Sequence, residues 1–578
     1  MSGLHDLRTA GREWAVRIVN RHWPMLIVLI PIAFTFYTWV ISNGVPYFTD
    51  GNETYSAYAH GRNMFLFHPL ANSLLTDDGV GLNPTEHPFT YTHQGNLPRY
   101  FTYLLFLVGI SSIKWQVLIA ALLSIWLSFW FAYQLFRRPL LPLATAFLLS
   151  FLASDFLGVL EWYGNLYRTW HLPLFFGCLW CTRRRSRTLF ACTIFFLLFQ
   201  MEFTFAVFTT VTCLGVLALS FRRPNSLKVA VAICAGASCS ILVFLAQLIT
   251  FLGWKGFQFD LSTTYTARNS NDVGWQAIRW FYESHNLVMW PSFSTTIHGF
   301  GPFITCTNQF GGLMYGDSIW LLASLGVLGS VLIQAGRVLA PHWYWKGGPL
   351  RTLAVSDSLM AIYLWPMTAG YLLLGFTMSG YTLSGYTQRW GPMLVFPIML
   401  SLLSMAFNVG TAVKLIAGRL PPMNHFAVLA GRIAVTGLAG YFLFLLISQS
   451  AQAYKLYPPF MHEPAHLLST TYAGRSFVSN TTYPHMIACY TQKWAYYSPL
   501  LFSPDEDLDQ TYNWNAGRLS NQEYKRPEYY LCQVVPYRRD VKCDEVAHEM
   551  EKRGHALVAK GATFAILKLN WRRIPSTP

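Results

Sequence analysis

The stretch Phe48-Thr-Asp-Gly-Asn-Glu-Thr-Tyr-Ser-Ala-Tyr-Ala-His-Gly-Arg62 follows the first long apolar segment of the chain, which covers residues 24–41. Two of its carboxylates, Asp50 and Glu53, lie just beyond the point where the chain leaves that segment. A carboxylate beside an apolar medium loses part of its hydration, so it is normally kept for catalysis, ion binding or an ion pair. A second polar stretch, His87-Pro-Phe-Thr-Tyr-Thr-His-Gln-Gly-Asn-Leu-Pro-Arg-Tyr100, follows before the next apolar segment. Residues 42–113 are therefore predicted to form one long loop that carries functional side chains.

The composition of the whole chain indicates a membrane protein. Of its 578 residues, 53% are hydrophobic and only 12% are charged, and the mean hydropathy is +0.31. A soluble protein carries roughly twice that charged fraction. Apolar runs recur across residues 24–452, and many approach the roughly 20 residues that a helix needs to cross a bilayer. We therefore predict an α-helical polytopic membrane protein.

The net charge of +15 reports the topology of the chain and not a nucleic-acid partner. Basic residues gather in short loops between apolar segments, as in Arg137-Arg138, Arg183-Arg184-Arg185 and Arg222-Arg223. These loops alternate with acidic or mixed loops, which is the positive-inside pattern of membrane proteins. Nucleic acid is therefore excluded as a partner, and membrane lipids are expected around the spans.

Placing the basic loops in the cytoplasm predicts about 11 spans and a C-terminus on the outer side, in a bacterial inner or plasma membrane. The long loops at 42–113 and 254–316 are then external. Within the first of them, residues 53–67 and 99–110 are predicted to form helices that lie at the interface. Residues 1–453 form the transmembrane domain in this scheme.

One apolar segment is too short for a full crossing. Only about fourteen apolar residues separate Arg187 from Glu202, fewer than a span needs. Together with 203–221 they predict a short hairpin whose tip carries Gln200, Met201 and Glu202. Irregular backbone at that depth is tolerated where it lines protein or a watery cavity, so we expect a cavity there.

From about residue 452 the sequence becomes polar and rich in turns. Strands are predicted at 474–480, 528–535 and 563–569, and helices at 483–497 and 544–560. Their alternation predicts a small extracytoplasmic α/β domain over 454–578. Two of its cysteines, Cys532 and Cys543, could form a disulfide if that compartment is oxidising.

The two polar stretches of the first long loop resemble the first external loop of the GT-C superfamily, the polytopic glycosyltransferases that use sugars linked to polyprenyl phosphate. Protein mannosyltransferases and aminoarabinose transferases are of this kind. The resemblance implies an enzyme that transfers a hexosyl or pentosyl group from a polyprenyl-phosphate donor to a lipid, glycan or protein. Attack by an acceptor hydroxyl would invert the anomeric centre. The sequence contains no phosphate-binding loop or nucleophile elbow, so it gives no support to ATP or nucleotide-sugar use.

By this resemblance Asp50 is the catalytic base or a metal ligand. The spacing Asp50-x-x-Glu53 replaces the adjacent acidic pair common in the superfamily, so that one residue or both could act. The structural alternative is that Asp50 caps the helix that follows it. His93 either polarises the acceptor or joins Asp50 and Glu53 around a divalent metal ion, although no tight spacing of ligands is present.

Three arginines are candidates to bind the donor phosphate, because a guanidinium offers a bidentate fork to phosphate oxygens. Arg389, in Gly385-Tyr-Thr-Gln-Arg-Trp-Gly-Pro392, resembles the arginine that many superfamily members place before a span containing proline. Arg168 is the second candidate, and its structural alternative is a surface ion pair with Glu161. Arg99 is the third, and it could instead extend along apolar surface towards the interface.

Two further carboxylates lie in apolar surroundings. Glu202, at the predicted hairpin tip, is a catalytic candidate because a carboxylate there is expensive unless it has a partner. The structural alternative is that Glu202 pairs with a neighbouring arginine or histidine. Asp357 lies near the predicted cytoplasmic end of a span, on the wrong side for this chemistry, and is expected to pair with an arginine of a loop.

Two other functions compete with glycosyl transfer. A transporter or flippase of lipid-linked sugars would show internal repeats and spans broken by polar groups, and the sequence shows neither. A polysaccharide polymerase or ligase would also carry large external loops, but an acidic cluster directly after the first span is less expected there.

Overall fold

The computed structural model describes slightly more than half of the chain. The described residues are 32, 36, 51–72, 74, 96–136, 166, 168–184, 187–221, 223–269, 317–339, 349–377, 393, 395–417, 462–480, 484–493, 495–497, 527–533 and 542–571.

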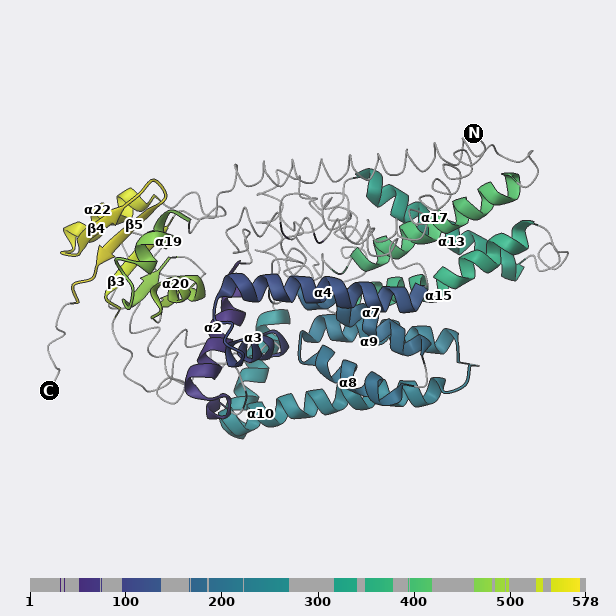
Figure 1. Ribbon diagram of the computed structural model, residues 1–578, viewed down its shortest axis with the longest axis horizontal. Coiled ribbons are helices and arrows are strands. Elements are labelled where there is room, and N and C mark those ends of the chain that lie inside the picture. The colour runs from purple at the N-terminus through teal and green to yellow at the C-terminus, as the bar shows by residue number, and fades with distance from the viewer. Residues whose placement is uncertain are drawn as a thin grey trace, which may run out of the picture.

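Most of the described residues are helical (Figure 1). The helices before the C-terminal sheet are α2 (Gly51–Phe67), α3 (Leu97–Leu107), α4 (Ile113–Phe136), α7 (His171–Arg183), α8 (Thr188–Phe199), α9 (Phe203–Leu219), α10 (Ser226–Asn269), α13 (Asp317–Leu339), α15 (Pro349–Thr377) and α17 (Val395–Ala417), with two short 3-10 helices, η1 (Pro69–Asn72) and η2 (Arg168–Trp170). The two helices predicted inside the first long loop are therefore present as α2 and α3.

Three helices in the described part of the chain are long and apolar enough to cross a membrane, namely Ile113–Leu135, Ser226–Gln258 and Trp320–Leu339. Each is almost free of charged residues over its apolar length, so it can lie in hydrocarbon with its backbone satisfied internally. The predicted total of about 11 spans stays a prediction, because the predicted first, third and eleventh spans lie outside the described residues.

The short hairpin predicted between Arg187 and residue 221 is confirmed. Helix α8 has 12 residues and is about 18 Å long, well short of a bilayer core. The chain breaks at Gln200–Glu202, and α9 begins at Phe203. The predicted tip residues therefore lie between two helices.

The helices pack through aromatic and small side chains. The rings of Phe175, Phe205 and Phe396 lie on α7, α9 and α17, with centroids 4.1 Å apart for the pair Phe175–Phe396 and 6.0 Å apart for Phe205–Phe396. On α9, Gly215 allows a close approach to α15, because a Cβ there would lie 2.7 Å from the Cβ of Pro366. Close packing of this kind suits helices that cannot rely on exclusion of water in a membrane.

Helix α10 extends further than predicted. The backbone turns at Gly253, where φ is +69°, and then remains helical to Asn269. Helix therefore covers the first part of the region 254–316, and the external placement of that region stays a prediction. A glycine adopts this positive φ without the steric strain of a side chain, so the helix can bend there and continue.

The prediction that Asp357 pairs with a loop arginine is wrong. Ser330 and Gln334 of α13 donate hydrogen bonds to its Oδ2 at 3.0 and 2.6 Å, and Ser404 and Asn408 of α17 donate to its Oδ1 at 3.1 and 2.8 Å. Asp357 itself lies on α15 and is fully buried. Its partners in the described part of the chain are neutral, and they join three helices at one carboxylate.

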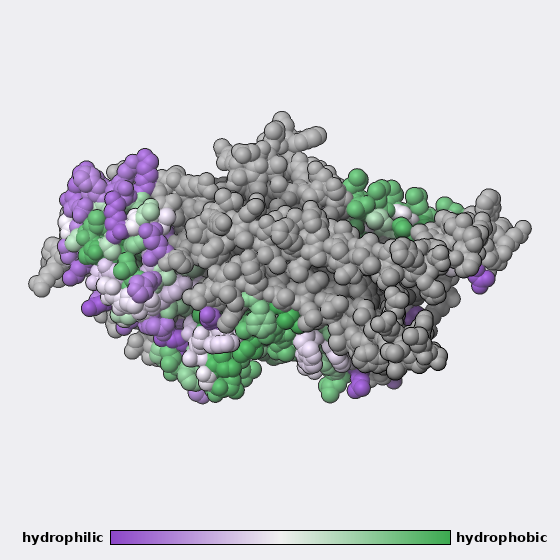
Figure 2. Space-filling model, turned by 45° about the horizontal axis from the view of Figure 1, so that its top comes forward, coloured by the Kyte–Doolittle hydropathy of each residue, from purple (hydrophilic) through white to green (hydrophobic). Residues whose placement is uncertain are grey.

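The C-terminal unit, residues 462–571, is built on one mixed five-stranded sheet with the order β2-β1-β3-β5-β4. Its elements are α19 (His462–Ser469), β1 (Phe477–Ser479), α20 (Pro484–Thr491), β2 (Ala495–Tyr497), β3 (Tyr529–Gln533), α22 (Cys543–Lys552), β4 (Ala556–Lys560) and β5 (Phe564–Lys568). The pairs β1–β2 and β1–β3 are parallel, whereas β3–β5 and β4–β5 are antiparallel. Figure 2 shows hydrophilic residues gathered over this end of the molecule and hydrophobic residues over the helical part.

Both helices predicted for this unit were too long. The first ends at Thr491, and β2 occupies residues that were assigned to it. The second ends at Lys552, Gly554 adopts a φ of +91°, and β4 follows. Glycine in the left-handed conformation is a common helix terminator, and the alternating exposure along β4 is that of a strand with one covered face.

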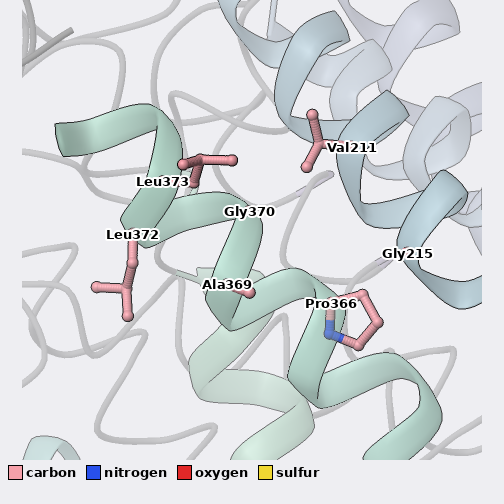
Figure 3. Close-up of a pocket in the computed structure, with 7 residues that line it drawn as sticks. All are labelled: Val211, Gly215, Pro366, Ala369, Gly370, Leu372 and Leu373. Carbon is pink, nitrogen blue, oxygen red and sulfur yellow. The ribbon is translucent and has the colours of Figure 1, made fainter. Parts of the chain in front are cut away.

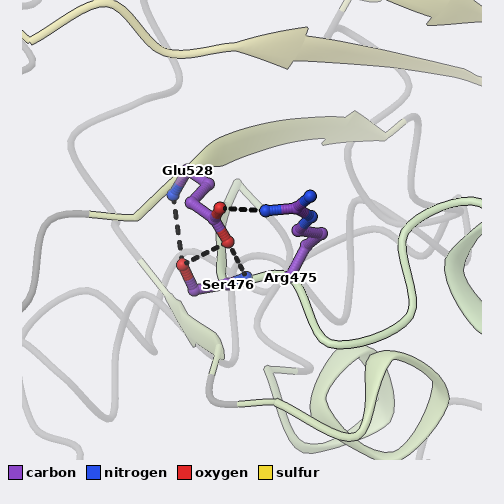
Figure 4. A network of polar contacts seen from close by, with 3 residues as sticks. All are labelled: Arg475, Ser476 and Glu528. Atoms are coloured by element: carbon purple, nitrogen blue, oxygen red, sulfur yellow. Dashed lines mark hydrogen bonds and ion pairs between the residues drawn. The ribbon is translucent and has the colours of Figure 1, made fainter.

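A polar contact fixes the start of the parallel part of the sheet (Figure 4). Arg475 donates to Glu528 Oε1 at 2.7 Å, and the backbone N–H of Ser476 donates to Glu528 Oε2 at 3.2 Å. The N–H of Glu528 in turn donates to the Ser476 hydroxyl at 3.2 Å. The ion pair is exposed and adds little free energy, so the backbone contacts do most to hold β1 and β3 in register.

Two of the three cysteines described in this unit, Cys532 on β3 and Cys543 on α22, are free and buried. A hydrogen bond with the Cys543 thiol, together with burial, raises the pKa of Cys532 well above its usual range. Cys532 is therefore neutral, and the predicted disulfide with Cys543 stays a prediction.

Candidate functional site

The acidic end of the first long loop lies at the start of α2. The helix begins at Gly51, directly after Asp50, and Glu53 belongs to its first turn. Asp50 and the side chain of Glu53 lie outside the described residues, so the predicted cap and the predicted catalytic role are both untested.

That helix end lies against the segment that leads to α7. The backbone N–H of Leu166 donates to the Thr54 hydroxyl at 3.2 Å, although the two residues are far apart in sequence. Two residues further on, Arg168 starts η2, and its side chain lies outside the described residues. Ser124 of α4 donates to the carbonyl of Thr169 and fixes η2 from the other side. Residues from α2 and from the start of α7 therefore share one site.

A second link joins α3 to the α8–α9 turn. The N–H of Leu97, the first residue of α3, donates to the carbonyl of Gln200 at 2.8 Å. Arg99 follows in the first turn of α3, and its guanidinium donates to Asn96 Oδ1 at 3.2 Å. Only 3% of Arg99 is exposed, which does not agree with a side chain that extends out to an interface. Arg99 is thus held inside the protein beside this turn.

The third link is a buried carboxylate–imidazole pair. His171 Nε2 and Glu202 Oε2 lie 3.0 Å apart, and the two side chains are 7% and 8% exposed. His171 is the first residue of α7, and Glu202 is the residue before α9. The ring of Phe205 meets the His171 ring edge to face at 4.4 Å and covers the pair. This contact is the one that the structural alternative for Glu202 predicted, and the catalytic role of Glu202 stays a prediction.

We call the assembly of residues 51–54, 96–99, 166–171 and 200–202 the polar junction. Three tertiary hydrogen bonds hold it together, Thr54–Leu166, Leu97–Gln200 and His171–Glu202. Gln200 also donates to Ser240 Oγ on α10 at 3.0 Å, so a fourth element supports the turn. The junction brings a carboxylate, an imidazole and a guanidinium into a largely enclosed, apolar protein. Such a set can hold or move a proton and can bind an anionic group.

Three of the predicted site residues remain outside this description. Asp50, His93 and Arg389 lie outside the described residues. Among the residues that are described, no group of three or more His, Cys, Asp or Glu is placed to hold a metal ion. The predicted divalent metal depends on Asp50 and His93, so it stays a prediction.

His171 was missing from the set of predicted catalytic residues. Two signals in the sequence could have found it. Glu202 at a helix break required a partner, and His171 lies at the predicted outer end of the preceding full span, on the same side of the membrane. Asn96 and Gln200 are ordinary polar residues in sequence, and only the tertiary contacts give them a place in the junction.

An apolar groove lies away from the junction, between α9 and α15 (Figure 3). Its volume is about 460 Å³. It is lined by Val211, Gly215, Pro366, Ala369, Gly370, Leu372 and Leu373. No side chain in this lining can donate or accept a proton, so the groove can hold an apolar chain but supplies no catalytic group.

No family model and no curated protein sequence matches this chain. Solved structures with a similar fold include the archaeal oligosaccharyltransferase AglB from Archaeoglobus fulgidus in complex with an inhibitory peptide and a dolichol-phosphate, with 12% identity and a TM-score of 0.45 over 89% of this chain and 70% of that chain. An oligosaccharyltransferase of the same organism in complex with Zn and sulfate gives 14% identity and a TM-score of 0.46 over 88% and 68%. ArnT from Cupriavidus metallidurans in the apo state gives 12% identity and a TM-score of 0.43 over 95% and 98%.

Proposed function

We propose that this chain is an integral-membrane glycosyltransferase that moves a sugar from a polyprenyl-phosphate donor to an acceptor hydroxyl on the extracytoplasmic side. The observation that carries the proposal is the polar junction, in which the helix after Asp50 contacts the segment that leads to His171, and in which the His171–Glu202 pair and Arg99 are buried. In a chain this apolar, ionisable groups that converge from distant segments are expected to serve a function. Their chemistry suits a reaction between an acceptor that carries a hydroxyl and a donor that carries a phosphate.

The reaction is a single displacement. The acceptor hydroxyl attacks the anomeric carbon, and the bond between that carbon and the donor phosphate oxygen breaks with inversion. The phosphate keeps the electron pair, and the hydroxyl proton passes to a carboxylate. We assign that base to Asp50 on the resemblance, with Glu53 beside it. The Glu202–His171 pair, in the same junction, accepts or relays the proton.

Charge develops mainly on the departing phosphate, so positioned cations contribute most to the rate. Arg99 meets this need best among the described arginine side chains, because its guanidinium is held inside the protein, where electrostatic attraction is less screened. Arg168 begins η2 in the same junction, and Arg389 is assigned to the phosphate on the resemblance alone. His93 would polarise the acceptor. We route no step through a metal ion.

The apolar groove supports a donor with an isoprenoid tail. It lies along α9, which begins one residue after Glu202. Val211 lies about 12 Å and Gly215 about 18 Å along that helix from Phe203 at the rise of an α-helix. A tail that ran along α9 would reach this groove while its phosphate stayed near the junction.

The decisive experiment is a transfer assay with the full chain in nanodiscs, using a panel of synthetic polyprenyl-phosphate hexoses and pentoses and a lipid, a glycan and a peptide acceptor. We expect one donor to be consumed with release of polyprenyl phosphate. Asp50→Asn should abolish transfer and keep the fold, because asparagine caps a helix as well as aspartate does. The control Glu463→Gln removes a carboxylate from the C-terminal unit and should leave turnover intact.

Turnover close to that of the wild type in Asp50→Asn would move the base to Glu53 or Glu202. A wild-type chain that carries a labelled donor across a sealed vesicle without releasing polyprenyl phosphate would favour a flippase instead. Labelling of introduced cysteines tests the orientation: residues 454–578 should react from the outer side and the loop at Arg183–Arg187 from the cytoplasm.

A further inference from the structure

The C-terminal unit is attached directly to α2, the helix that begins after Asp50. Tyr490 of α20 and Tyr55 of α2 share a hydrogen bond between their hydroxyls at 2.9 Å, and their ring centroids lie 5.9 Å apart. The thiol of Cys489 lies 3.9 Å from the carbonyl oxygen of Tyr55. Two neighbouring residues of α20 therefore contact one residue of α2.

Tyr55 belongs to the core of the C-terminal unit. Only 1% of it is exposed, and it packs in one cluster with Leu468, Phe477 and Ile487 of that unit. Burial raises the pKa of both phenols above their usual range. Both hydroxyls are therefore neutral across the physiological range, and one donates to the other.

Another part of α2 is held by α3. A Cβ on Gly61 would lie 2.6 Å from the Cβ of Thr102, so the two helices touch at this glycine. The rings of Tyr58 and Phe106 lie 5.3 Å apart, and the Tyr58 hydroxyl donates to the carbonyl of Ser111 at 2.8 Å. Helix α2 is thus clamped between α3 and α20.

Tyr55 lies near the start of α2, next to a residue of the polar junction. Tyr55 follows Thr54, whose hydroxyl accepts the hydrogen bond from Leu166 in the polar junction. It is two residues after Glu53 and five after Asp50. The contact between Tyr55 and α20 therefore lies directly after the first turn of α2, close to the position of the predicted acidic residues.

We propose that Tyr55 and Tyr490 form a positioning pair, through which the C-terminal unit holds the first turn of α2, and with it Asp50 and Glu53, in the polar junction. This inference rests on the proposed function. A displacement of about 1 Å at a reacting group can lower a rate by up to about 10²-fold. A single hydroxyl–hydroxyl contact at this place can therefore set the rate without touching the substrate.

The test uses the full chain in nanodiscs and the variants Tyr490→Phe, Tyr55→Phe and their double mutant. Each keeps the ring and removes only a hydroxyl. We expect kcat to fall about tenfold with KM unchanged. The double mutant should be no worse than either single variant, because all three lose the same contact. Tyr529→Phe, on β3 of the same unit, is the matched control and should leave kcat intact.

Hydrogen–deuterium exchange supplies a readout that does not depend on activity. Tyr490→Phe should speed exchange in a peptide over 51–67 and leave exchange in α15 and α17 unchanged. Unchanged exchange in α2 overturns the inference, as does faster exchange with an unchanged kcat. If the wild-type chain transfers no sugar, the proposed function fails, and exchange alone then decides whether the C-terminal unit holds α2.

Discussion

Two buried carboxylates, Asp357 and Glu202, have both lost their hydration, and they are compensated for this loss by different kinds of partner. A carboxylate removed from water must find hydrogen-bond donors or a counter-charge. Asp357 lies within a continuous helix and receives four neutral donors, two on each oxygen. Glu202 lies at a break between two helices and faces the imidazole of His171.

The difference separates a structural carboxylate from one that can act. A carboxylate has about four acceptor positions, so the donors around Asp357 saturate it and leave no position for a substrate. Its partners cannot change charge, and they tie α15 to α13 and α17. The partner of Glu202 is a histidine, the residue type whose side chain most readily changes charge near neutral pH. The Glu202–His171 pair lies in the polar junction. The first arrangement suits stability, and the second suits proton transfer.

The largest expected effect concerns Glu202. Glu202→Gln keeps the size of the side chain and its contact with His171 but removes the charge and the ability to take a proton. We expect the rate of transfer to fall by about 10²–10⁴-fold, the range for a lost acid–base group, with little change in thermal unfolding. The rate of transfer is measured as the rate of polyprenyl-phosphate release by the protein in nanodiscs. Near-normal turnover would place Glu202 with Asp357 as a structural residue.

Asp357→Ala should give the reverse result. It leaves four donors without an acceptor inside the helices, so we expect a loss of about 3 kcal/mol in the free energy of unfolding. Thermal unfolding in detergent should show a lower midpoint. The turnover of the protein that remains folded should equal that of the wild type. A loss of turnover with an unchanged midpoint would contradict the structural role.

His171→Gln sharpens the comparison because it gives Glu202 a neutral partner of the kind that Asp357 has. Glutamine can still donate to the carboxylate but cannot take up a proton near neutral pH. We expect about a tenfold loss of kcat and a flatter dependence of kcat on pH. His466→Gln in α19 is the control. An unchanged pH profile would remove His171 from the reaction and leave it as a packing residue.

The contrast also shows how much of the molecule the sequence could predict. The interrupted hairpin was predictable, because its first apolar run is too short to span and Glu202 follows it directly. The presence of α2 and α3 and a mainly helical chain were predictable for similar reasons. These features depend on the length and polarity of local segments, which can be read along the chain.

Features that depend on contacts between distant segments could not be predicted. The partners of Asp357 are serine, glutamine and asparagine side chains, and nothing in their local sequence marks them as neighbours of a carboxylate. The pair His171–Glu202 joins residues 31 positions apart. In the C-terminal unit, the sequence over 556–560 predicts a continuation of the preceding helix, but these residues form strand β4 because they pair with β5.

The smallest expected effect concerns an exposed carboxylate, Glu463 of α19, which extends the comparison to the surface. Its side chain accepts hydrogen bonds from the Thr563 hydroxyl at 2.7 Å and from the N–H groups of Ala562 and Thr563 at 2.9 and 3.2 Å, and so holds the turn between β4 and β5. These bonds, the Thr563 hydroxyl first, lower the pKa of Glu463 below its ordinary value of 4.5. Because the folded pKa is depressed, the stabilisation is present above that ordinary value and is lost as the pH falls through the folded pKa.

Glu463→Gln should therefore speed hydrogen exchange of a peptide over 556–568 at neutral pH, by an amount worth less than about 1 kcal/mol because the site is exposed. The difference from the wild type, compared at each pH so that intrinsic exchange cancels, should shrink below about pH 4.5. The exposed Glu551→Gln is the control, and a difference that persists into acid would mean that the contact depends on the shape of the side chain and not on its charge.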